Sequence, residues 1–459
     1  MTLWSSTDVE TATGGFATTN WSATGISIDT RTIQVGELFV ALKDQRDGHN
    51  FVATALANGA SAALVSRVPD GVDKNAPLLI VPDVLAALQD MAQFARARTS
   101  AVVIGVTGSV GKTSTKEMLK MILSISGKVH VAEKSFNNHW GVPLTLARMP
   151  INANFAVIEI GMNSPGEIRP LAKLANLDIA MVLNVSAVHL KSFKNVQEIA
   201  YAKSEIFENL SSKATAIVNN DLPSTPVMMK IIKKVEAKII TFGHAIDSDY
   251  RLIETDRQDT KTISHVMING INTTFNFHAE GNHFAMNALA AIAAAQVAGG
   301  SLSEIIQALS DWEAPAGRGE RKSIKYGSGC IELIDESYNA NPASMAAALE
   351  VLANSEALGS KIAILGEMGE LGSEELSYHV DLASLDVITN IDIFHLVGPM
   401  MQSMYKALPI EKRGLWVETT DELVLQIRSL LSVNDIVMVK GSNYTRVSKI
   451  VEVIKKLDA

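Results

Sequence analysis

The sequence AVVIGVTGSVGKTST, residues 101–115, decides the fold. Its apolar start, Ala101 to Val106, predicts a buried strand, and the pattern from Lys112 to about Ser126 predicts a helix. Between them stands a glycine-containing loop, at the place where phosphate-binding loops occur. The loop consists of Thr107, Gly108, Ser109, Val110, Gly111, Lys112 and Thr113.

This loop has the groups that are needed to bind a nucleoside triphosphate. Backbone N–H groups and the start of the helix present partial positive charge to phosphate oxygens. Lys112 can reach the outer phosphates, and the Thr113 hydroxyl can ligate Mg²⁺. Val106 stands where the usual motif has its first glycine, so the motif is a shortened form. The alternative is a glycine turn that is followed by an incidental lysine.

Apolar runs and helical patterns alternate on both sides of the loop and predict an α/β protein with three domains. We expect a small α/β N-terminal domain over residues 1–97 and a central phosphate-loop domain with a mainly parallel sheet over 98–313. A Rossmann-like C-terminal domain is expected over 314–459. Hinges are expected at 96–100 and 314–317, with rigid-body motion about both.

The expected strands lie at 38–42, 62–65, 101–106, 155–160, 178–185, 331–335, 361–365, 391–397 and 435–439. The expected helices lie at 112–126, 198–210, 283–297, 343–354, 374–385, 421–431 and 446–456. Asn269-Gly270 inside residues 262–277 predicts a β-hairpin.

Composition excludes several classes of protein. The net charge of −9 argues against nucleic-acid binding. A single cysteine, Cys330, allows no internal disulfide and is expected in the core because it precedes an apolar strand. Residues 1–10 lack signal-peptide features, and no apolar run is long enough to span a membrane. We therefore expect a cytoplasmic, soluble protein.

Three charged residues fall where apolar or loop residues are usual. Glu159 interrupts an apolar strand and needs a cation or strong donors if it is buried. It could instead reach water at the strand end. His189 follows a strand, where α/β sheets place ligand groups, although a loop histidine is often only a surface residue. Lys203 lies in the apolar stripe of a helix, and its spacing alone favours a side chain that snorkels to water.

Several longer motifs resemble those of the Mur ligase family. They are SFNNHWGVPLTL (135–146), GNHFAMNALAA (281–291) and DESYNANP (335–342), together with DTR (29–31), GELFVA (36–41), DGH (47–49) and VKGS (439–442). The resemblance covers nearly the whole chain. The Ser-Tyr-Asn-Ala-Asn motif is typical of the subtype that adds D-alanyl-D-alanine. The Asp-Asn-Pro-Arg motif of the diaminopimelate-adding subtype is absent.

The resemblance implies an activity. An ATP-dependent, ADP-forming ligase would join D-alanyl-D-alanine to UDP-N-acetylmuramoyl-tripeptide through an acyl phosphate, in peptidoglycan precursor synthesis. ATP and two Mg²⁺ would be required, and a monomer is expected. Another Mur or folylpolyglutamate-type ligase is the nearest alternative. A non-catalytic phosphate-loop switch is a more distant one.

The resemblance also implies a role for each site residue. Lys112, Glu159, His189, Lys203 and Arg318 would be catalytic. Thr113, Glu159, His189 and Lys203 would hold the two cations, with Lys203 as a carbamate. Asn287 would contact adenine, while Arg318 and Asp335 would reach the outer phosphates and the ribose. The substrate residues would be Asp29, Thr30, Arg31, Asn137, Asn138, Ser337, Tyr338, Asn339 and Asn341.

The sequence departs from the family pattern at two places. Leu190-Lys-Ser-Phe-Lys194 replaces a glycine-containing loop after His189, and Phe284 stands where asparagine is common. Both leave every proposed ligand in place.

Overall fold

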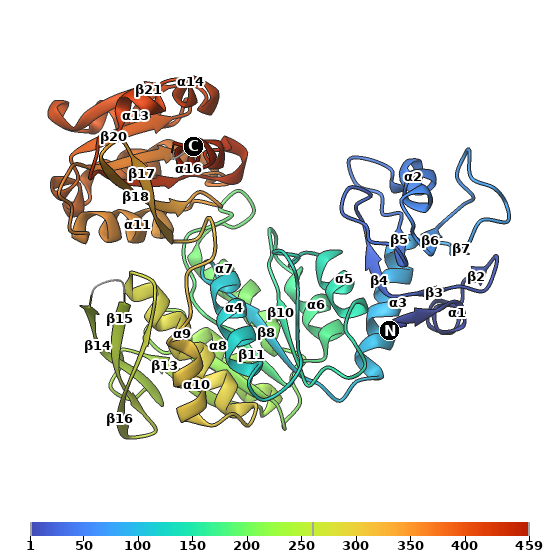
Figure 1. Cartoon of the computed structure of the whole chain (residues 1–459). Helices are drawn as coiled ribbons and strands as arrows, with labels where there is room; N and C mark the ends of the chain where they lie inside the picture. The colour runs from blue at the N-terminus through green and yellow to red at the C-terminus, as the bar shows by residue number, and fades with distance from the viewer. Residues whose placement is uncertain (1, 259–260, 458–459) are drawn as a thin grey trace.

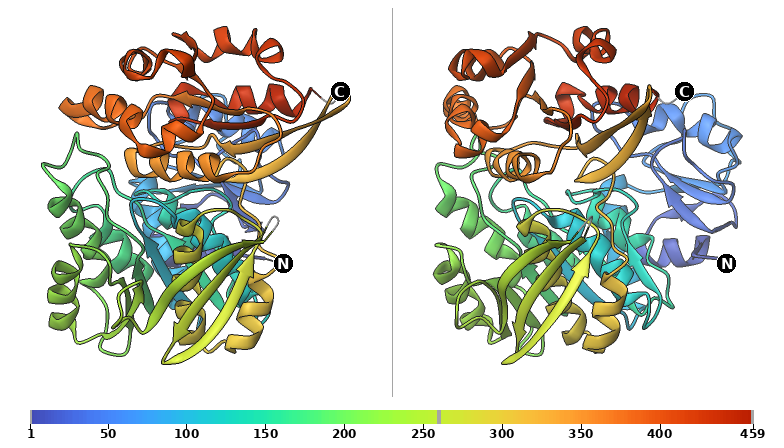
Figure 2. Two further views of the ribbon diagram at one scale, coloured as in Figure 1. Left: turned by 90° about the vertical axis from the view of Figure 1, so that its left-hand side faces the viewer. Right: turned by 60° about the vertical axis from the view of Figure 1, so that its left-hand side comes forward.

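A computed structural model describes residues 2–258 and 261–457. The chain forms three lobes, each built around its own main β-sheet (Figure 1). The C-terminal lobe lies above the central lobe in both turned views, and in the right-hand view the N-terminal lobe lies to one side (Figure 2). The α/β prediction is thus confirmed.

The N-terminal lobe has a five-stranded sheet in the order β2-β7-β6-β5-β4, in which only β2 runs antiparallel, and a short β1-β3 pair. Its strands are β1 (Trp4–Ser5), β2 (Phe16–Ala17), β3 (Ser22–Ala23), β4 (Gly25–Ser27), β5 (Glu37–Val40), β6 (Ala62–Val65) and β7 (Leu78–Ile80). Its helices are α1 (Ser6–Thr13), α2 (Val52–Ala57) and α3 (Val84–Ala97).

The central lobe has a nine-stranded sheet in the order β16-β15-β14-β13-β12-β11-β8-β10-β9. Its strands are β8 (Val102–Thr107), β9 (Val129–Val131), β10 (Phe155–Glu159), β11 (Ile179–Val182), β12 (Thr215–Asn219), β13 (Lys238–Gly243), β14 (Tyr250–Gln258), β15 (Lys261–Ile268) and β16 (Ile271–Phe277). Its helices are α4 (Lys112–Leu123), α5 (Gly141–Ala147), α6 (Ile168–Ala175), α7 (Val196–Ser204), α8 (Thr225–Val235), α9 (Asn282–Val297) and α10 (Leu302–Leu309).

The phosphate-loop strand β8 lies between β10 and β11 and is parallel to both. Residues of β8 alternate between two cores: Ile104 packs with α4 and α9, whereas Val103 packs with α5, α6 and α7. This burial on both faces explains the unbroken apolar run that predicted the strand. The predicted hairpin is confirmed as β15 and β16, and they extend the parallel sheet in antiparallel fashion.

The C-terminal lobe has a six-stranded sheet in the order β17-β18-β22-β19-β20-β21, parallel except for the edge strand β17. Its strands are β17 (Glu320–Tyr326), β18 (Gly329–Glu336), β19 (Lys361–Gly366), β20 (Ile393–Val397), β21 (Arg413–Val417) and β22 (Ile436–Lys440). Its helices are α11 (Pro342–Asn354), α12 (Glu375–Asp381), α13 (Met401–Ala407), α14 (Thr420–Val424), α15 (Ile427–Leu430) and α16 (Ser448–Lys455).

Three predictions for this lobe are wrong. The helix expected at 421–431 is the two short helices α14 and α15. The last helix starts at Ser448 because Arg446 has a φ of 55°, which no right-handed helix accommodates. Cys330 is exposed rather than part of the core, since it lies near the start of β18 with its neighbour Ile331 pointing inward.

The N-terminal lobe joins the central lobe through apolar packing. Helix α3 presents Met91 and Ala95 to the N-terminal core, which also contains Leu144 of α5, while Ala92 packs into the central core. The expected hinge at 96–100 begins inside this helix. Arg96 donates to the carbonyl oxygens of Ala175 and Asn176, and so fastens the helix end to the central lobe.

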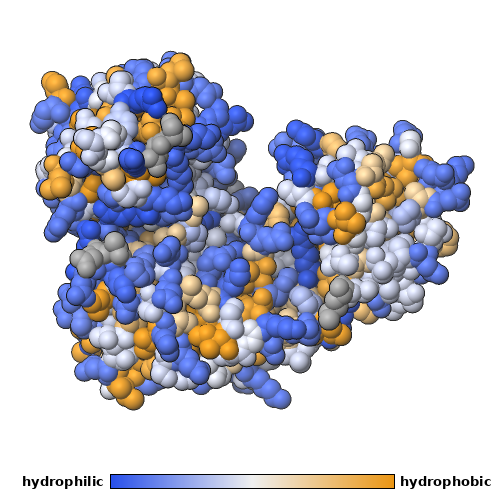
Figure 3. Space-filling model, in the orientation of Figure 1, coloured by the Kyte–Doolittle hydropathy of each residue, from blue (hydrophilic) through white to orange (hydrophobic). Residues whose placement is uncertain are grey.

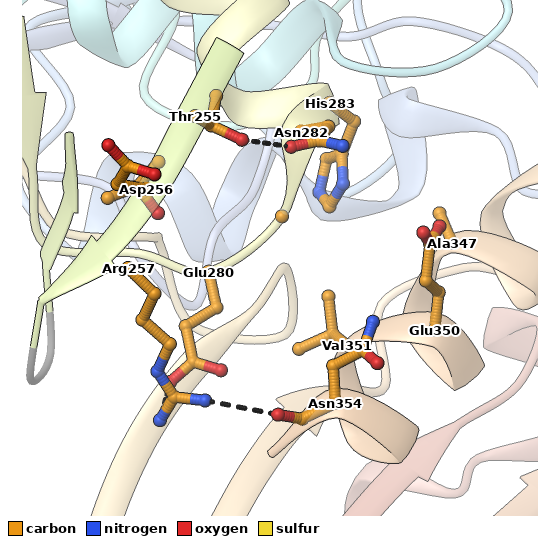
Figure 4. Close-up of a pocket in the computed structure, with 12 residues that line it drawn as sticks. Thr255, Asp256, Arg257, Glu280, Asn282, His283, Ala347, Glu350, Val351 and Asn354 are labelled. Atoms are coloured by element: carbon orange, nitrogen blue, oxygen red, sulfur yellow. Dashed lines mark hydrogen bonds and ion pairs between the residues drawn. The ribbon is translucent and has the colours of Figure 1, made fainter. Parts of the chain in front are cut away.

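The C-terminal lobe meets the central lobe through polar contacts near the β14–β15 hairpin (Figure 4). Glu280, in the turn before α9, forms ion pairs with Arg257 of β14 at 3.1 Å and with Arg321 of β17. Arg257 also donates to the backbone carbonyl of Asn354 at the end of α11. Glu280 is therefore a junction between the two lobes.

No helix among residues 2–258 and 261–457 is long and apolar enough to cross a membrane.

We expect Glu280→Gln to loosen the C-terminal lobe, because the substitution leaves two arginines facing an uncharged amide. Small-angle X-ray scattering should show a larger radius of gyration than for the unaltered protein. The matched control is Glu254→Gln, which removes the same charge from an exposed position of β14. Identical scattering profiles for Glu280→Gln and the control would contradict this role.

Candidate functional site

The phosphate loop turns sharply where β8 ends and α4 begins. Gly111 precedes the helix with a φ of 84°, a conformation that side-chain-bearing residues rarely adopt. A Cβ atom on Gly111 would lie 2.6 Å from the Asn287 side-chain oxygen. Asn287 of α9 is thus held directly against the phosphate loop, and its contact with adenine stays a prediction.

Glu159 is buried beside the loop, with only 2% of its surface exposed. Its carboxylate accepts hydrogen bonds from the Thr113 hydroxyl at 2.9 Å and from the Asn137 amide at 2.8 Å. The alternative that Glu159 reaches water at the strand end is therefore wrong. Two predicted cation ligands, Thr113 and Glu159, adjoin because β10 runs beside β8.

A cavity of about 330 Å³ opens next to this pair, between the central and C-terminal lobes. The central lobe lines it with Lys112, Asn137, Asn138, His189 and Lys203. The C-terminal lobe contributes Asn339 and Asn341, together with Gly369, Glu370, Ser442, Asn443 and Tyr444. One space thus collects predicted site residues that are far apart in the sequence.

Lys203 does not snorkel to water, contrary to what its spacing alone favoured. It is 2% exposed and forms no hydrogen bond or ion pair with any of the residues that the structure describes. Burial, and secondarily the nearby cation of Lys112, hold the pKa of Lys203 well below its usual value. Only the neutral form of an amine reacts with CO₂, and a lowered pKa makes that form more accessible.

The phosphate-loop lysine is held in place by the backbone. The Lys112 ammonium donates to the Gly108 carbonyl at 2.7 Å. Burial lowers the pKa of Lys112, while Glu159 raises it and Arg318 lowers it further. These two residues of opposite charge therefore both act on the ammonium that would meet the outer phosphates.

His189 lies in the loop between β11 and α7 and is bound from the opposite lobe. Its Nδ1 atom shares a hydrogen bond with the Glu370 carboxylate, and this bond lowers the pKa of Glu370. The sequence did not single out Glu370. The available signal was its place between two glycines, Gly369 and Gly372, which is typical of a tightly folded loop.

Arg318 reaches the phosphate-loop region from the linker between the lobes. Its guanidinium donates to the Ser135 hydroxyl at 3.1 Å, and Ser135 lies 3.1 Å from the Thr113 hydroxyl. The same guanidinium covers the Tyr338 ring, 4.0 Å from its centre. This placement fits the predicted approach of Arg318 to the outer phosphates.

Two predicted site residues are engaged elsewhere in the C-terminal lobe. Asp335 accepts a hydrogen bond from the Ser337 hydroxyl at 2.6 Å and forms an ion pair with Lys455 at 3.3 Å. Ser337 and Tyr338 do not line the cavity that holds Lys203, whereas Asn339 and Asn341 do. Asn341 also caps α11 by accepting from the Ser344 backbone N–H. Of the four residues predicted to lie near the dipeptide (Ser337, Tyr338, Asn339 and Asn341), only the last two thus line this cavity.

A second cavity, of about 580 Å³, lies between the N-terminal and central lobes. Asp29, Thr30 and Arg31 line it as a group, and Arg31 holds the pKa of Asp29 at about 2 through an ion pair. The sequence assigned no role to the other charged and aromatic residues that line it: Phe39, Arg46, Phe51, Glu133, Lys134, Phe136, Trp140 and Arg148.

The segment 135–140 connects the two cavities. Phe136 and Trp140 line the N-terminal cavity, whereas Asn137 and Asn138 line the cavity beside Lys203. A hollow separates the N-terminal and C-terminal lobes above the central lobe (Figure 3). One long ligand could therefore extend along this segment from the first cavity to the second.

The residue set fits a bound divalent cation, although residues 2–258 and 261–457 contain no group of three or more His, Cys, Asp or Glu that could hold one. Mg²⁺ commonly uses one or two protein oxygens and takes its other ligands from phosphates and water. Thr113 and Glu159 supply such a pair. A second cation would need an anionic group at Lys203 to complete the donor set with His189.

Phe284, the residue that replaces the common asparagine, is buried among apolar neighbours. Its ring lies 5.4 Å from that of Trp312, centre to centre, and it packs beneath Gly319 of the linker. It therefore supports the linker rather than the phosphate loop.

Fold and site together define a phosphate-loop α/β nucleotide-binding protein whose separate C-terminal lobe lines the same cavity. Family comparison agrees: residues 106–295 match the Mur ligase middle domain and residues 317–443 match the Mur ligase glutamate ligase domain. The chain belongs to the Mur ligase family.

Individual relatives are similar over nearly their full length. The UDP-N-acetylmuramoyl-tripeptide–D-alanyl-D-alanine ligase of Rickettsia prowazekii is 32% identical, with 98% of this chain and 99% of the relative covered. The crystal structure of MurF from Acinetobacter baumannii matches with a TM-score of 0.84, 29% identity and 99% coverage of both chains. MurF from Thermotoga maritima in complex with ADP matches with a TM-score of 0.78, 25% identity, and coverage of 94% and 97%.

We expect Glu159→Gln to raise the Mg²⁺ concentration needed for half-maximal ADP release by at least about tenfold. The amide keeps the size of the side chain but removes the negative charge beside Thr113. A Mg²⁺ titration of the coupled ADP assay measures the shift. Glu304→Gln, an exposed change on α10, serves as the control; an equal Mg²⁺ dependence in both variants would exclude Glu159 as a ligand.

Proposed function

We propose that this chain is an ATP-dependent, ADP-forming ligase that joins D-alanyl-D-alanine to UDP-N-acetylmuramoyl-tripeptide. The products would be UDP-N-acetylmuramoyl-pentapeptide, ADP and phosphate, in peptidoglycan precursor synthesis. The observation that carries the proposal is the shared cavity, in which Lys112 of the phosphate loop faces Asn339 and Asn341 of the C-terminal lobe. The D-alanyl-D-alanine ligases among the relatives support this choice of substrates.

The chemistry is limited by the repulsion between two anions. The tripeptide carboxylate must attack the γ-phosphorus of ATP, which breaks the bond to ADP and forms an acyl phosphate. Lys112 and Arg318 offset the negative charge that gathers there. The dipeptide amine then attacks the acyl carbon, phosphate leaves with the electron pair of the broken C–O bond, and the amine loses its proton. The cavity fixes these groups in place and excludes water.

Residues of the central lobe would hold the cations. Thr113 and Glu159 would bind the one on ATP, and His189, Glu159 and Lys203 as a carbamate would bind the other. Bound Mg²⁺ would neutralise charge on the phosphoryl group. The Lys203 side chain supports the carbamate, because it is only 2% exposed and lines the cavity.

Each lobe would carry one substrate. Residues 1–97 would bind the UDP portion through Asp29, Thr30 and Arg31, and residues 98–313 would bind ATP with Asn287 at the adenine. Residues 314–459 would bind the dipeptide and close on ATP through Arg318 and Asp335. We further propose that the protein is cytoplasmic, because ATP and the nucleotide-linked substrate are cytoplasmic. We also propose that it is a monomer, since residues of this one chain line the shared cavity from both lobes.

ADP release is expected to require both UDP-N-acetylmuramoyl-tripeptide and D-alanyl-D-alanine. Omitting the dipeptide should lower steady-state ADP release to a small fraction of the full rate, since the acyl phosphate then has no amine to attack. A coupled assay measures ADP release with and without the dipeptide, and then with L-glutamate, diaminopimelate or folate substrates in place of the proposed pair. Faster turnover with any of these would identify another ligase of the family, and nucleotide binding without turnover would indicate a switch protein.

Lys203→Ala is expected to lose most activity, because the substitution removes the proposed carbamate. Added acetate or formate should restore part of the rate by placing a carboxylate in the space that the side chain leaves. The control is Lys194→Ala, since Lys194 is exposed in the preceding loop. Full activity of Lys203→Ala, or a loss that short carboxylates do not relieve, would count against the carbamate.

A further inference from the structure

Two loops from different lobes, which carry His189 and Glu370, are in contact at the edge of the cavity that Lys203 lines. Gly372, with a φ of 72°, lies so close to the His189 loop that a Cβ atom on it would come within 3.3 Å of the Leu190 carbonyl carbon and oxygen. Two residues earlier, the Glu370 carboxylate hydrogen-bonds with Nδ1 of His189. The contact therefore joins backbone to backbone as well as side chain to side chain.

Both bonded residues have unusual backbones. His189 has a φ of 54° and Glu370 a φ of 64°, in the left-handed region that residues other than glycine seldom occupy. Such conformations persist where the surroundings determine them, and they occur often at binding sites and switches. Here the left-handed turns point the imidazole and the carboxylate at each other across the interface between the lobes.

The hydrogen bond has a chemical consequence for His189. A neutral imidazole that donates from Nδ1 to a carboxylate carries its lone pair on Nε2. Histidines that bind metals are commonly oriented in this way by a carboxylate, which also makes the ring a stronger donor. In this chain the orienting carboxylate comes from the C-terminal lobe rather than from the lobe that carries the histidine.

We propose that Glu370 is a positioning residue through which docking of the C-terminal lobe prepares His189 to bind a divalent cation. The inference rests on the proposed function, because it needs His189 as a cation ligand. When the lobe docks, the Glu370 carboxylate accepts a hydrogen bond from the Nδ1–H of His189 and fixes the ring with Nε2 free. When the lobe moves away, the ring loses its orientation.

The coupling must act in both directions. If docking of the C-terminal lobe strengthens cation binding at His189, cation binding strengthens docking by the same factor. The cation on the phosphate-loop side has no ligand that Glu370 contacts, so docking changes its binding only indirectly, through Glu159, the ligand that both cations share. The account therefore predicts that one of the two cation affinities depends much more strongly on the C-terminal lobe than the other.

Mn²⁺ binding to the full-length protein, followed by electron paramagnetic resonance with a non-hydrolysable ATP analogue present, tests this proposal. Glu370→Ala should weaken one of two Mn²⁺ sites by about tenfold, the same site that His189→Ala weakens, as the loss of an orienting carboxylate does in metal sites. Glu370→Gln, which keeps an acceptor, should fall between Ala and the unaltered protein. Glu374→Ala, an exposed change two residues after Gly372, should have no effect.

A double-substitution comparison separates positioning from a general structural role. If Glu370 acts through His189, adding Glu370→Ala to His189→Ala should cause no further loss of Mn²⁺ affinity. A further loss of similar size in the double variant would overturn the proposal. So would unchanged Mn²⁺ affinity in Glu370→Ala while the unaltered protein binds two ions. If the unaltered protein binds only one ion, the two-cation part of the proposed function fails along with this inference.

Discussion

A buried carboxylate beside a phosphate-binding loop is the constraint on which the rest of the site depends. Glu159 is placed by β10 next to the strand that carries the loop, and the Thr113 hydroxyl and the Asn137 amide bind it. A triphosphate and a substrate carboxylate would add negative charge to the same space. Under the proposed function the site works only if cations are assembled around it, and Lys112, Arg318 and any bound Mg²⁺ would be those cations.

The lobes are attached in two different ways, and the difference suits this requirement. The N-terminal lobe shares an apolar core with α5 of the central lobe through α3. The C-terminal lobe is held near the site by polar contacts: the Glu280 ion pairs, the bond between Arg318 and Ser135, and the bond between His189 and Glu370. Polar interfaces of this kind separate more readily than apolar ones. The lobe that supplies Arg318 is thus the one suited to move.

Much of the fold could be predicted because the pattern of apolar residues is local. The run at 101–106 is buried on both faces, and Asn269-Gly270 forms the expected turn, so both elements were found. The strands β17 and β21 were missed because they are partly exposed edge strands without an unbroken apolar run. Arg446 shortened the last predicted helix because a positive φ at a residue other than glycine leaves no mark in the sequence.

Site residues could be predicted where a charged side chain interrupts an apolar pattern. Glu159 in a strand and Lys203 on an apolar helix face were visible, and both are buried. The glycines around Glu370 indicated a tight loop but not its role, because that role arises from contact with a loop 181 residues away. The hydrogen bond from Ser337 to Asp335 spans only two residues, and it was missed because a motif does not say which way its side chains point. Contacts across the lobes depend on how the lobes dock, which local sequence does not record.

A crystal structure with Mg²⁺ and a non-hydrolysable ATP analogue would test the central claim most directly. The account predicts that oxygens of Thr113 and Glu159 lie at the site of the cation on the triphosphate, with a metal–oxygen distance of about 2.1 Å for each direct ligand. It also predicts the Arg318 guanidinium at the outer phosphates. A triphosphate bound away from Glu159 and Thr113, or one that Arg318 does not approach in a closed form, would contradict it.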